Sequence, residues 1–452
     1  MKQTITVFWR NYKVLIILLA LGFIVRGLFF GAILRNHGPQ GFALPVNEDA
    51  GEYVAIAKNL ADRGIFSRDP APPFSPERLR TPGYPLFLAI WYRLVPSLPF
   101  LTAMQNAFFL IGIILAYHVS LRAFGDKTAA LLAAGVLAIE PTVAYWNNQL
   151  TTESVFTVSV LAATYCFLAF LQGSPRRFVF YAGFFLGFAL LIRPITEYLG
   201  IIFLAALFIL GVQKRIPWKR LVFGAAIFAA GYFITVTPWM IRNQLLFGTT
   251  SVSTMNVGFG KYLKAIQKEL GISVNYAFYG GIPRTEVERL ALVRADALRL
   301  VAQHPFLFVK IHLIGLVPFF LGDGYGTTFG VLFPALRESR VVTDWSGSPA
   351  EIISFLRGHT GLEGVVFWGG KFIWGALVFA ALVGAGLLLK AGGWNRRFAI
   401  FFLLIVYYFA LASGVGSYSR FRFPVNPYIF IFTAVGSTAA INWLRSQYKK
   451  AV

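Results

Sequence analysis

Residues 14–34 read VLIILLALGFIVRGLFFGAIL. A helix of about 20 apolar residues crosses a bilayer core, so this stretch predicts a transmembrane span. Comparable runs recur along the chain, at 100–121, 145–171, 178–212, 221–241, 305–321, 365–389, 398–413 and 423–443. Arg193-Pro194 divides one of them, and 127–141 can form a shorter span. We therefore expect an all-α polytopic membrane protein with about eleven to thirteen transmembrane helices.

The composition agrees with a membrane protein. The 452 residues are 57% hydrophobic and 13% charged, whereas soluble domains carry about 25% charged residues. The formal net charge of +22 does not come from one patch, so no nucleic-acid partner is expected. The basic residues gather in short segments that hold 17 of the 41 Lys and Arg but a single acid, Asp126: 1–13, 122–127, 174–177, 213–220, 390–397 and 445–452.

These basic segments predict the topology. The positive-inside rule places them and both termini in the cytoplasm, so the long loops 35–99 and 242–304 are expected on the opposite side. We expect the protein to lie in a bacterial inner membrane, with its active site on this side, in the periplasm. The first span follows Lys2, Arg10 and Lys13 and is expected to remain as a signal anchor. No linker interrupts the chain, so 1–452 is expected to form one membrane domain.

The first outer loop concentrates acids that the rest of the chain largely lacks. Glu48, Asp49 and Glu52 stand at the start of a helix expected from Asp49 to Arg63. Its apolar positions form one stripe, Tyr53, Ile56, Ala57 and Leu60, from which Glu52 faces away. Asp49 lies on the stripe, so its carboxylate can point over the membrane domain and act as a general base. The alternative is a helix N-cap, because Asp49-Ala50-Gly51-Glu52 resembles a capping box.

Charged residues within apolar runs are the second signal. Glu140, Glu153 and Glu197 approach the outer face, and Glu153 is the most suggestive because it begins an otherwise apolar helix. Six arginines are also expected on that face: Arg26, Arg80, Arg193, Arg242, Arg420 and Arg422. Guanidinium groups bind phosphate through charge-assisted bonds, so these arginines predict a lipid-phosphate site. For each arginine the alternative is pairing with an acid or a helix-end carbonyl.

Several short motifs follow one another in a characteristic order. They are Asp49-Ala50-Gly51-Glu52-Tyr53, Arg80-Thr81-Pro82-Gly83-Tyr84-Pro85, Thr152-Glu153-Ser154, Leu191-Ile192-Arg193-Pro194, Pro238-Trp239-Met240-Ile241-Arg242-Asn243, Ser253-Thr254-Met255-Asn256 and Arg420-Phe421-Arg422-Phe423-Pro424. In this order the chain resembles the GT-C superfamily of polyprenyl-phosphate-sugar glycosyltransferases, in particular the bacterial protein-mannosyltransferase and aminoarabinose-transferase-like branch. Region 322–364 matches no pattern of that family.

The resemblance implies an inverting sugar transfer with the first-loop acid as catalytic base, which is Asp49 by motif position. Glu48 and Glu153 are the further catalytic candidates. Tyr53, Tyr84, Asn243 and Asn256 lie in the matching motifs and are the candidates for substrate binding. The expected partners are the polyprenyl-phosphate sugar and a periplasmic acceptor.

The function that we expect is therefore transfer of a sugar from undecaprenyl phosphate to a periplasmic lipid, glycan or protein. No cofactor is required for this chemistry and no metal site is predicted, since the five His residues lack a ligand spacing. Glu48 and Asp49 could still share a divalent ion. Two alternatives stay open, a transporter or lipid-sugar flippase and a non-catalytic glycan-binding scaffold. A transporter should place polar groups near the midplane, whereas here they collect at one face.

Overall fold

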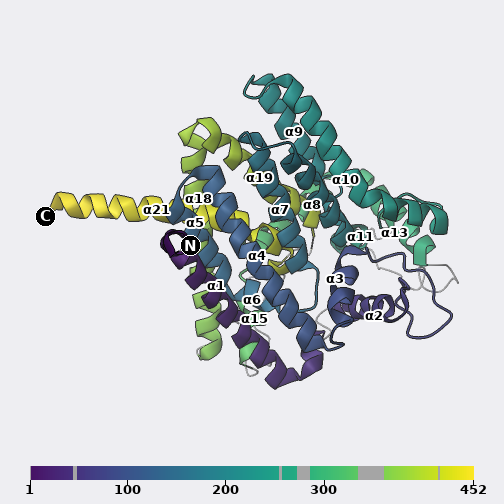
Figure 1. Cartoon of the computed structure of the whole chain (residues 1–452). Coiled ribbons are helices and arrows are strands. Elements are labelled where there is room, and N and C mark those ends of the chain that lie inside the picture. Colours follow the sequence, from purple (N-terminus) through teal and green to yellow (C-terminus); the bar gives the residue numbers. More distant parts are fainter. Residues whose placement is uncertain are drawn as a thin grey trace.

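The computed structural model describes residues 2–43, 48–253, 257–271, 286–333, 361–415 and 418–451. These residues form helices joined by turns and loops, without a strand (Figure 1). The helices up to the middle of the chain are α1 (Lys2–His37), η1 (Pro39–Phe42), α2 (Glu48–Arg63), α3 (Gly83–Tyr92), α4 (Leu98–Phe124), α5 (Lys127–Ile139), α6 (Pro141–Asn147), α7 (Glu153–Leu171), α8 (Arg177–Ile192), η2 (Pro194–Thr196) and α9 (Leu199–Val212). The others are α10 (Trp218–Phe247), α11 (Val257–Glu269), α13 (Glu286–Gln303), α14 (Pro305–Leu321), α15 (Tyr325–Leu332), α18 (Leu362–Ala391), α19 (Gly393–Ser413), α20 (Ser419–Arg422), η3 (Phe423–Val425) and α21 (Asn426–Ala451).

The all-α membrane fold expected from the sequence is confirmed. Within the described ranges, eight helices are long and apolar enough to cross a bilayer, and two pairs of helices, each bent at a break, are long and apolar enough when taken together. The structure also has one shorter apolar helix, Arg177–Ile192. The predicted count of about eleven to thirteen transmembrane helices stays a prediction. One break follows from local sequence, because Pro141 starts α6 and Glu140 Oε2 accepts from the Val143 backbone N–H at 2.6 Å, which bends this pair by 56°.

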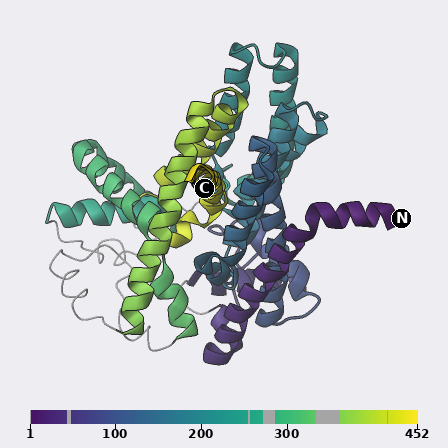
Figure 2. The ribbon, with the colours of Figure 1, turned by 90° about the vertical axis from the view of Figure 1, so that its left-hand side faces the viewer.

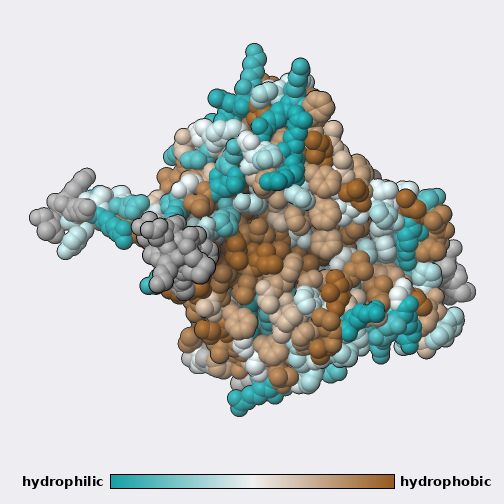
Figure 3. Space-filling model, in the orientation of Figure 1, coloured by the Kyte–Doolittle hydropathy of each residue, from teal (hydrophilic) through white to brown (hydrophobic). Residues whose placement is uncertain are grey.

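Helix α7 lies at the centre of the bundle, and 94% of its most apolar 18-residue stretch is buried. It packs mainly on α4 and α8, and the η3 turn before α21 also contacts it. The outer helices instead turn large apolar side chains outward: Phe23, Ile234, Phe372 and Phe379 are each more than half exposed. Figure 3 shows the resulting apolar band between two hydrophilic ends. An exposed apolar surface of this extent fits contact with lipid.

Glycines allow α8 and α10 to pack with their backbones in contact. A Cβ added at Gly183 would lie 2.0 Å from the Phe228 carbonyl oxygen, and one at Gly231 would lie 2.2 Å from the Phe180 carbonyl oxygen. These distances are far below a normal contact, so a larger residue at either position would force the helices apart. We call this contact the α8–α10 seam.

Four of the six predicted cytoplasmic segments gather at one end of the bundle. They line or border a groove of about 500 Å³ formed by Ala123, Leu171, Gln172, Gly173, Arg215, Ile216, Pro217, Arg220, Trp394 and Phe398. Hydrogen bonds join them directly, from Arg122 to Gln172 at 3.1 Å and from Arg397 to Gln213 at 2.9 Å. The shared location supports the prediction that these segments face the same side.

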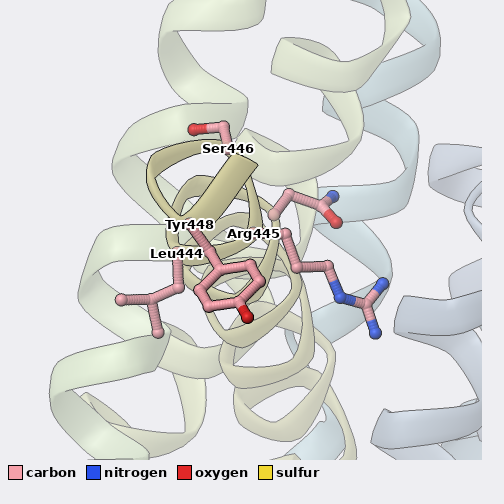
Figure 4. A pocket seen from close by; sticks show the side chains of 5 residues that line it. Leu444, Arg445, Ser446 and Tyr448 are labelled. Atoms are coloured by element: carbon pink, nitrogen blue, oxygen red, sulfur yellow. The ribbon is translucent and has the colours of Figure 1, made fainter. Parts of the chain in front are cut away.

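The ends of the chain and the second outer loop lie apart from this core. Figure 2 shows α1 and the packed pair α11 and α13 on opposite sides of the bundle. Helix α13 lies within the predicted second outer loop, 242–304. The last turns of α21 project from the bundle and carry Leu444, Arg445, Ser446 and Tyr448 around a shallow hollow (Figure 4). A basic residue among exposed aromatic and apolar ones is typical of a helix end at a membrane interface.

The topology predicts unequal labelling of two exposed lysines. After replacement of Cys166, a cysteine at Lys268 in α11 should react with a membrane-impermeant thiol reagent in intact cells, because α11 belongs to the predicted periplasmic loop. A cysteine at Lys219, in a predicted cytoplasmic segment, should react only after the membrane is permeabilised. Both lysines are exposed. If only position 219 is labelled in intact cells, the predicted orientation of the protein in the membrane is wrong.

Candidate functional site

Helix α2 positions Asp49 by burying one face against α3. The buried side chains on this face are Ala50, Tyr53, Ile56 and Ala57, so the predicted apolar stripe is the buried face. Near the other end of the helix, the Asn59 amide donates to the backbone carbonyls of Ser67 at 2.8 Å and Asp69 at 2.9 Å. These bonds tie α2 to the following loop. The Asp49 side chain lies at the start of the buried face and is 34% exposed.

The segment from Arg80 to Pro85 docks against the end of α8. The Thr81 hydroxyl donates to the Ile192 carbonyl at 3.1 Å. Gly83 begins α3 where an added Cβ would lie 2.9 Å from both the carbonyl carbon and the oxygen of Leu191. Only a residue without a side chain permits this approach. Arg80 is therefore held beside α8, whose last residues lead into Arg193.

Substitution of Gly83 by Ala should destabilise the protein by about 1–3 kcal/mol, because the added methyl group would press on the backbone of α8. The same change at Gly51 in α2 is the matched control, since nothing lies within 4 Å of a Cβ there. Gly51→Ala should be neutral or slightly stabilising, as Ala is the better helix former. Thermal unfolding of the two purified variants in detergent measures the difference. Equal melting temperatures would show that the close approach does not matter.

Glu77 fixes the backbone around Arg80. Its Oε1 accepts from the backbone N–H of Leu79 at 2.7 Å and of Arg80 at 3.2 Å, and its Oε2 lies 3.3 Å from Arg68 Nε. The side chain of Glu77 is 2% exposed. A buried carboxylate with several donors holds its loop in one conformation, and this loop presents the Arg80 side chain.

The Arg80 side chain joins two acids of α2. Its Nη2 donates to Asp49 Oδ1 at 2.6 Å and its Nε donates to Glu52 Oε2 at 2.6 Å. The guanidinium carbon lies 5.0 Å from the centre of the Tyr53 ring. Burial by itself lowers the pKa of Arg80, but the carboxylates of Asp49 and Glu52 raise it, so the pKa lies above the ordinary value and the group stays charged. Burial also raises the pKa of Tyr53, whose hydroxyl stays protonated at neutral pH.

Arg420 connects this first group to the centre of the bundle. Its Nη2 lies 3.4 Å from Asp49 Oδ2, and its Nε donates to Glu153 Oε1 at 2.6 Å. Arg193 Nη1 donates to the same Glu153 oxygen at 3.0 Å. The Glu153 side chain is fully buried at the start of α7. Residues 49, 80, 153, 193 and 420 therefore converge, although they lie in five separate parts of the chain.

We call the resulting network the ion-pair cluster. It consists of Asp49, Glu52, Arg80, Glu153, Arg193 and Arg420. It contains three carboxylates and three guanidinium groups, so these groups balance in charge. Ion pairs buried beside apolar helices cost desolvation energy and contribute little net stability, which makes such a cluster a candidate functional site.

Three predicted phosphate-binding arginines, Arg26, Arg242 and Arg422, lie outside this cluster. Arg26 donates to the carbonyls of Gly22 and Ala138, each at 2.9 Å, and so caps the end of α5. Arg422 donates to the Phe319 carbonyl and to Asn426, and it lies over the Trp374 ring at 3.7 Å. These contacts favour the helix-anchoring alternative for both residues. Their assignment to the donor remains a prediction that the contacts do not support.

Arg242 and Asn243 form a clamp between the two outer loops. Arg242 Nη1 donates to the Glu77 carbonyl at 2.8 Å, and its guanidinium lies over the Trp239 ring at 4.4 Å. The Asn243 amide donates to the Ser251 carbonyl at 2.8 Å. In the described part of the chain, the clamp connects to the ion-pair cluster through Glu77 and the backbone of Arg80. Roles for Arg242 and Asn243 in binding phosphate or substrate therefore remain predictions, and their contacts favour a structural role.

The other candidates differ in how far the structure describes them. Tyr53 lies within the cluster and contacts Arg80, whereas Tyr84 is buried behind it and donates to Gln105 Oε1 at 2.6 Å. Glu48 is the first residue of α2, but the structure does not describe its side chain. Asn256 lies outside the described residues. Their roles stay predictions. Over the described residues, no group of three or more His, Cys, Asp or Glu is arranged to hold a metal ion.

Sequence reasoning missed Glu52 as a member of the ion-pair cluster, and it missed two residues beside the cluster, Arg68 and Glu77. Glu52 was expected to face away, yet it binds Arg80 and lies 2.8 Å from Arg68 Nη1. Arg68 and Glu77 lie in an irregular loop, where no periodicity shows which way a side chain points. Their short spacing from Arg80 was the only available signal, and it does not reveal direction.

Comparison with known proteins relates the chain to a family of enzymes. The profile of the dolichyl-phosphate-mannose-protein mannosyltransferase family matches residues 80–239, a stretch that contains Arg80, Glu153 and Arg193. This match relates that part of the chain to glycosyltransferases. No curated protein sequence matches the chain at a significant level.

Solved structures show the fold more broadly. The chain superposes on the oligosaccharyltransferase AglB from Archaeoglobus fulgidus, in complex with an inhibitory peptide and a dolichol-phosphate, with a TM-score of 0.52 and 16% identity. The apo form of the Archaeoglobus fulgidus enzyme gives a TM-score of 0.53 and 16% identity. In each case the alignment covers 98% of this chain and 52% of the other, so the chain spans about half the length of that enzyme.

A weaker likeness, which supports no conclusion by itself, is to ArnT from Cupriavidus metallidurans bound to undecaprenyl phosphate. It has a TM-score of 0.41 and 13% identity over 95% of this chain and 79% of the other. The family match and the AglB likeness confirm the resemblance predicted from the motifs. The chain is a multi-pass membrane protein with the fold of the GT-C superfamily.

Proposed function

We propose that this protein is a glycosyltransferase of the bacterial inner membrane that transfers a sugar from a polyprenyl phosphate, such as undecaprenyl phosphate, to a periplasmic acceptor. The acceptor is a lipid, a glycan or a protein. The observation that carries the proposal is the ion-pair cluster, in which a partly exposed carboxylate lies between arginines at one end of the bundle. AglB, with the same fold, was determined in complex with a dolichol-phosphate and a peptide, which supports these substrate classes.

The cluster contains the groups that this reaction requires. As the acceptor oxygen attacks the anomeric carbon, its proton passes to the Asp49 carboxylate, which serves as general base. The bond between the anomeric carbon and the phosphate oxygen breaks, and the leaving polyprenyl phosphate keeps the electron pair. Arg420 and Arg80 stabilise this negative charge, because preorganised cations act strongly where water is scarce. Attack opposite the leaving group inverts the anomeric configuration.

The burial of the acids supports Asp49 as the base. Asp49 is 34% exposed, so a hydroxyl group can reach it, whereas the Glu153 side chain is fully buried. A general base must lie within hydrogen-bonding reach of the proton that it removes. Glu153 is consequently the weaker of these two catalytic candidates.

Mass spectrometry of lipid-linked sugars and envelope glycans tests the proposal. Cells with the wild-type protein are compared with cells that express Asp49→Asn at the same level, so that only the carboxylate differs. Under the proposal, the variant accumulates a polyprenyl phosphate sugar and lacks one sugar on an envelope acceptor. The accumulating lipid would identify the donor, and the acceptor that lacks a sugar would identify the acceptor. Identical profiles would contradict a transferase function.

A further inference from the structure

The two acids that contact Arg420 differ in their surroundings. The Glu153 side chain is fully buried, and its Oε1 lies 2.6 Å from Arg420 Nε and 3.0 Å from Arg193 Nη1. The Asp49 side chain is 34% exposed, and its Oδ2 lies 3.4 Å from Arg420 Nη2. The contacts of Glu153 with Arg420 and Arg193 are therefore closed to solvent, whereas the longer contact between Asp49 and Arg420 lies next to solvent.

This asymmetry determines which acid an incoming anion can replace. An anion that approaches from solvent meets the Arg420 and Arg80 guanidinium groups on the side where Asp49 lies. It can take the place of Asp49, whose carboxylate can turn toward water. Glu153 cannot leave Arg193 and Arg420 without becoming a buried unpaired charge, which is strongly unfavourable.

We propose that Asp49 is an exchangeable counter-ion of Arg80 and Arg420 that the phosphate of the lipid donor displaces, and that Glu153 is a positioning residue that keeps Arg193 and Arg420 in place. This inference rests on the proposed function, and it adds an order of events. In the ligand-free protein, each Asp49 oxygen faces a guanidinium group. The donor phosphate draws these cations to itself and leaves the carboxylate free to accept the acceptor's proton, so the donor binds before the acceptor reacts.

The proposal predicts opposite effects of two neutralising substitutions on phosphate binding. Asp49→Asn removes the competing charge and should bind undecaprenyl phosphate more tightly than wild type, by about twofold to fivefold, as expected for a partly exposed ion pair. Glu153→Gln should bind it about tenfold or more weakly, because the arginines lose their fixed partner. Binding of the sugar-free lipid to the purified protein is measured by its dissociation constant.

Matched controls separate these effects from general damage. Asp62→Asn makes the same change at an exposed position of α2, and Glu140→Gln removes a buried acid that caps α6. Both should leave the affinity unchanged. Polyprenol, which lacks the phosphate, is the second probe. Glu153→Gln and Asp49→Asn should bind it like wild type, whereas a loss of packing would alter both probes alike.

The result that would overturn the proposal is specific. Weaker binding by Asp49→Asn would mean that Asp49 helps to hold the phosphate, for example through a shared cation. Affinity equal to that of Asp62→Asn would mean that Asp49 does not compete for the arginines, and unchanged binding by Glu153→Gln would remove its positioning role. If the opposite shifts occur but glycan profiles do not change, the phosphate site stands and the transferase function fails.

Discussion

Asp49→Asn is expected to lower sugar transfer by about two to four orders of magnitude, the usual contribution of a general base. Asn keeps the size of the side chain and caps a helix about as well as Asp. The fold should therefore survive, and donor binding should not weaken. Turnover is measured with purified protein and saturating lipid donor, so that a change in affinity does not enter the result.

The capping alternative predicts a different pattern for the same position. Asp49 is the second residue of α2; if it only stabilises the first turn of this helix, Asn should be nearly silent, and Ala should destabilise the protein by about 1 kcal/mol. Asp62→Asn, on the exposed side of α2, is the control for a lost charge. Wild-type transfer by Asp49→Asn would refute the assignment and direct attention to Glu48.

Arg420→Gln should have the second large effect. Loss of a charge-assisted hydrogen bond to phosphate costs about 1.5–3 kcal/mol, which corresponds to donor binding about 10-fold to 150-fold weaker. Stability should fall as well, because the fully buried Glu153 then keeps only Arg193 as an ion-pair partner in the cluster. The dissociation constant for undecaprenyl phosphate and the melting temperature are measured on the same preparation.

Arg422→Gln provides the matched control from the same short helix. Arg422 is also buried, but it binds the Phe319 carbonyl and Asn426. Its substitution should lower the melting temperature and leave phosphate affinity unchanged. If Arg422→Gln weakens phosphate binding as much as Arg420→Gln does, the ion-pair cluster is not the donor site that we describe.

The sequence was sufficient to find most of the cluster. Asp49, Glu153, Arg193 and Arg420 stand out because a charge beside long apolar runs is costly and needs a partner. Arg80 stands out through its motif. The membrane fold was predictable for the related reason that spans of bilayer length must be apolar throughout.

The hydrogen-bond partners of the other arginines could not be predicted from the sequence. Arg26 binds the carbonyl of Ala138, which lies 112 positions away, and only the packing of α1 on α5 brings the two together. Arg420 and Arg422 are two residues apart yet serve different parts of the fold, because the short helix α20 turns them in different directions. The pattern identified charged residues near the outer face but did not indicate which of them would find a carbonyl.

The α8–α10 seam connects the pieces on which the cluster depends. The end of α8 supports Thr81 and Gly83 and leads into Arg193, while the end of α10 carries the clamp on Glu77. The glycines at the seam bring the two backbones into direct contact, which leaves little room for one helix to slide along the other. The two helices should therefore move together as one rigid unit. The arginines are then already in place before the lipid binds. The conformational entropy of ordering them is lost during folding and not again each time a lipid binds. Motions that admit an acceptor would therefore have to arise elsewhere in the outer loops.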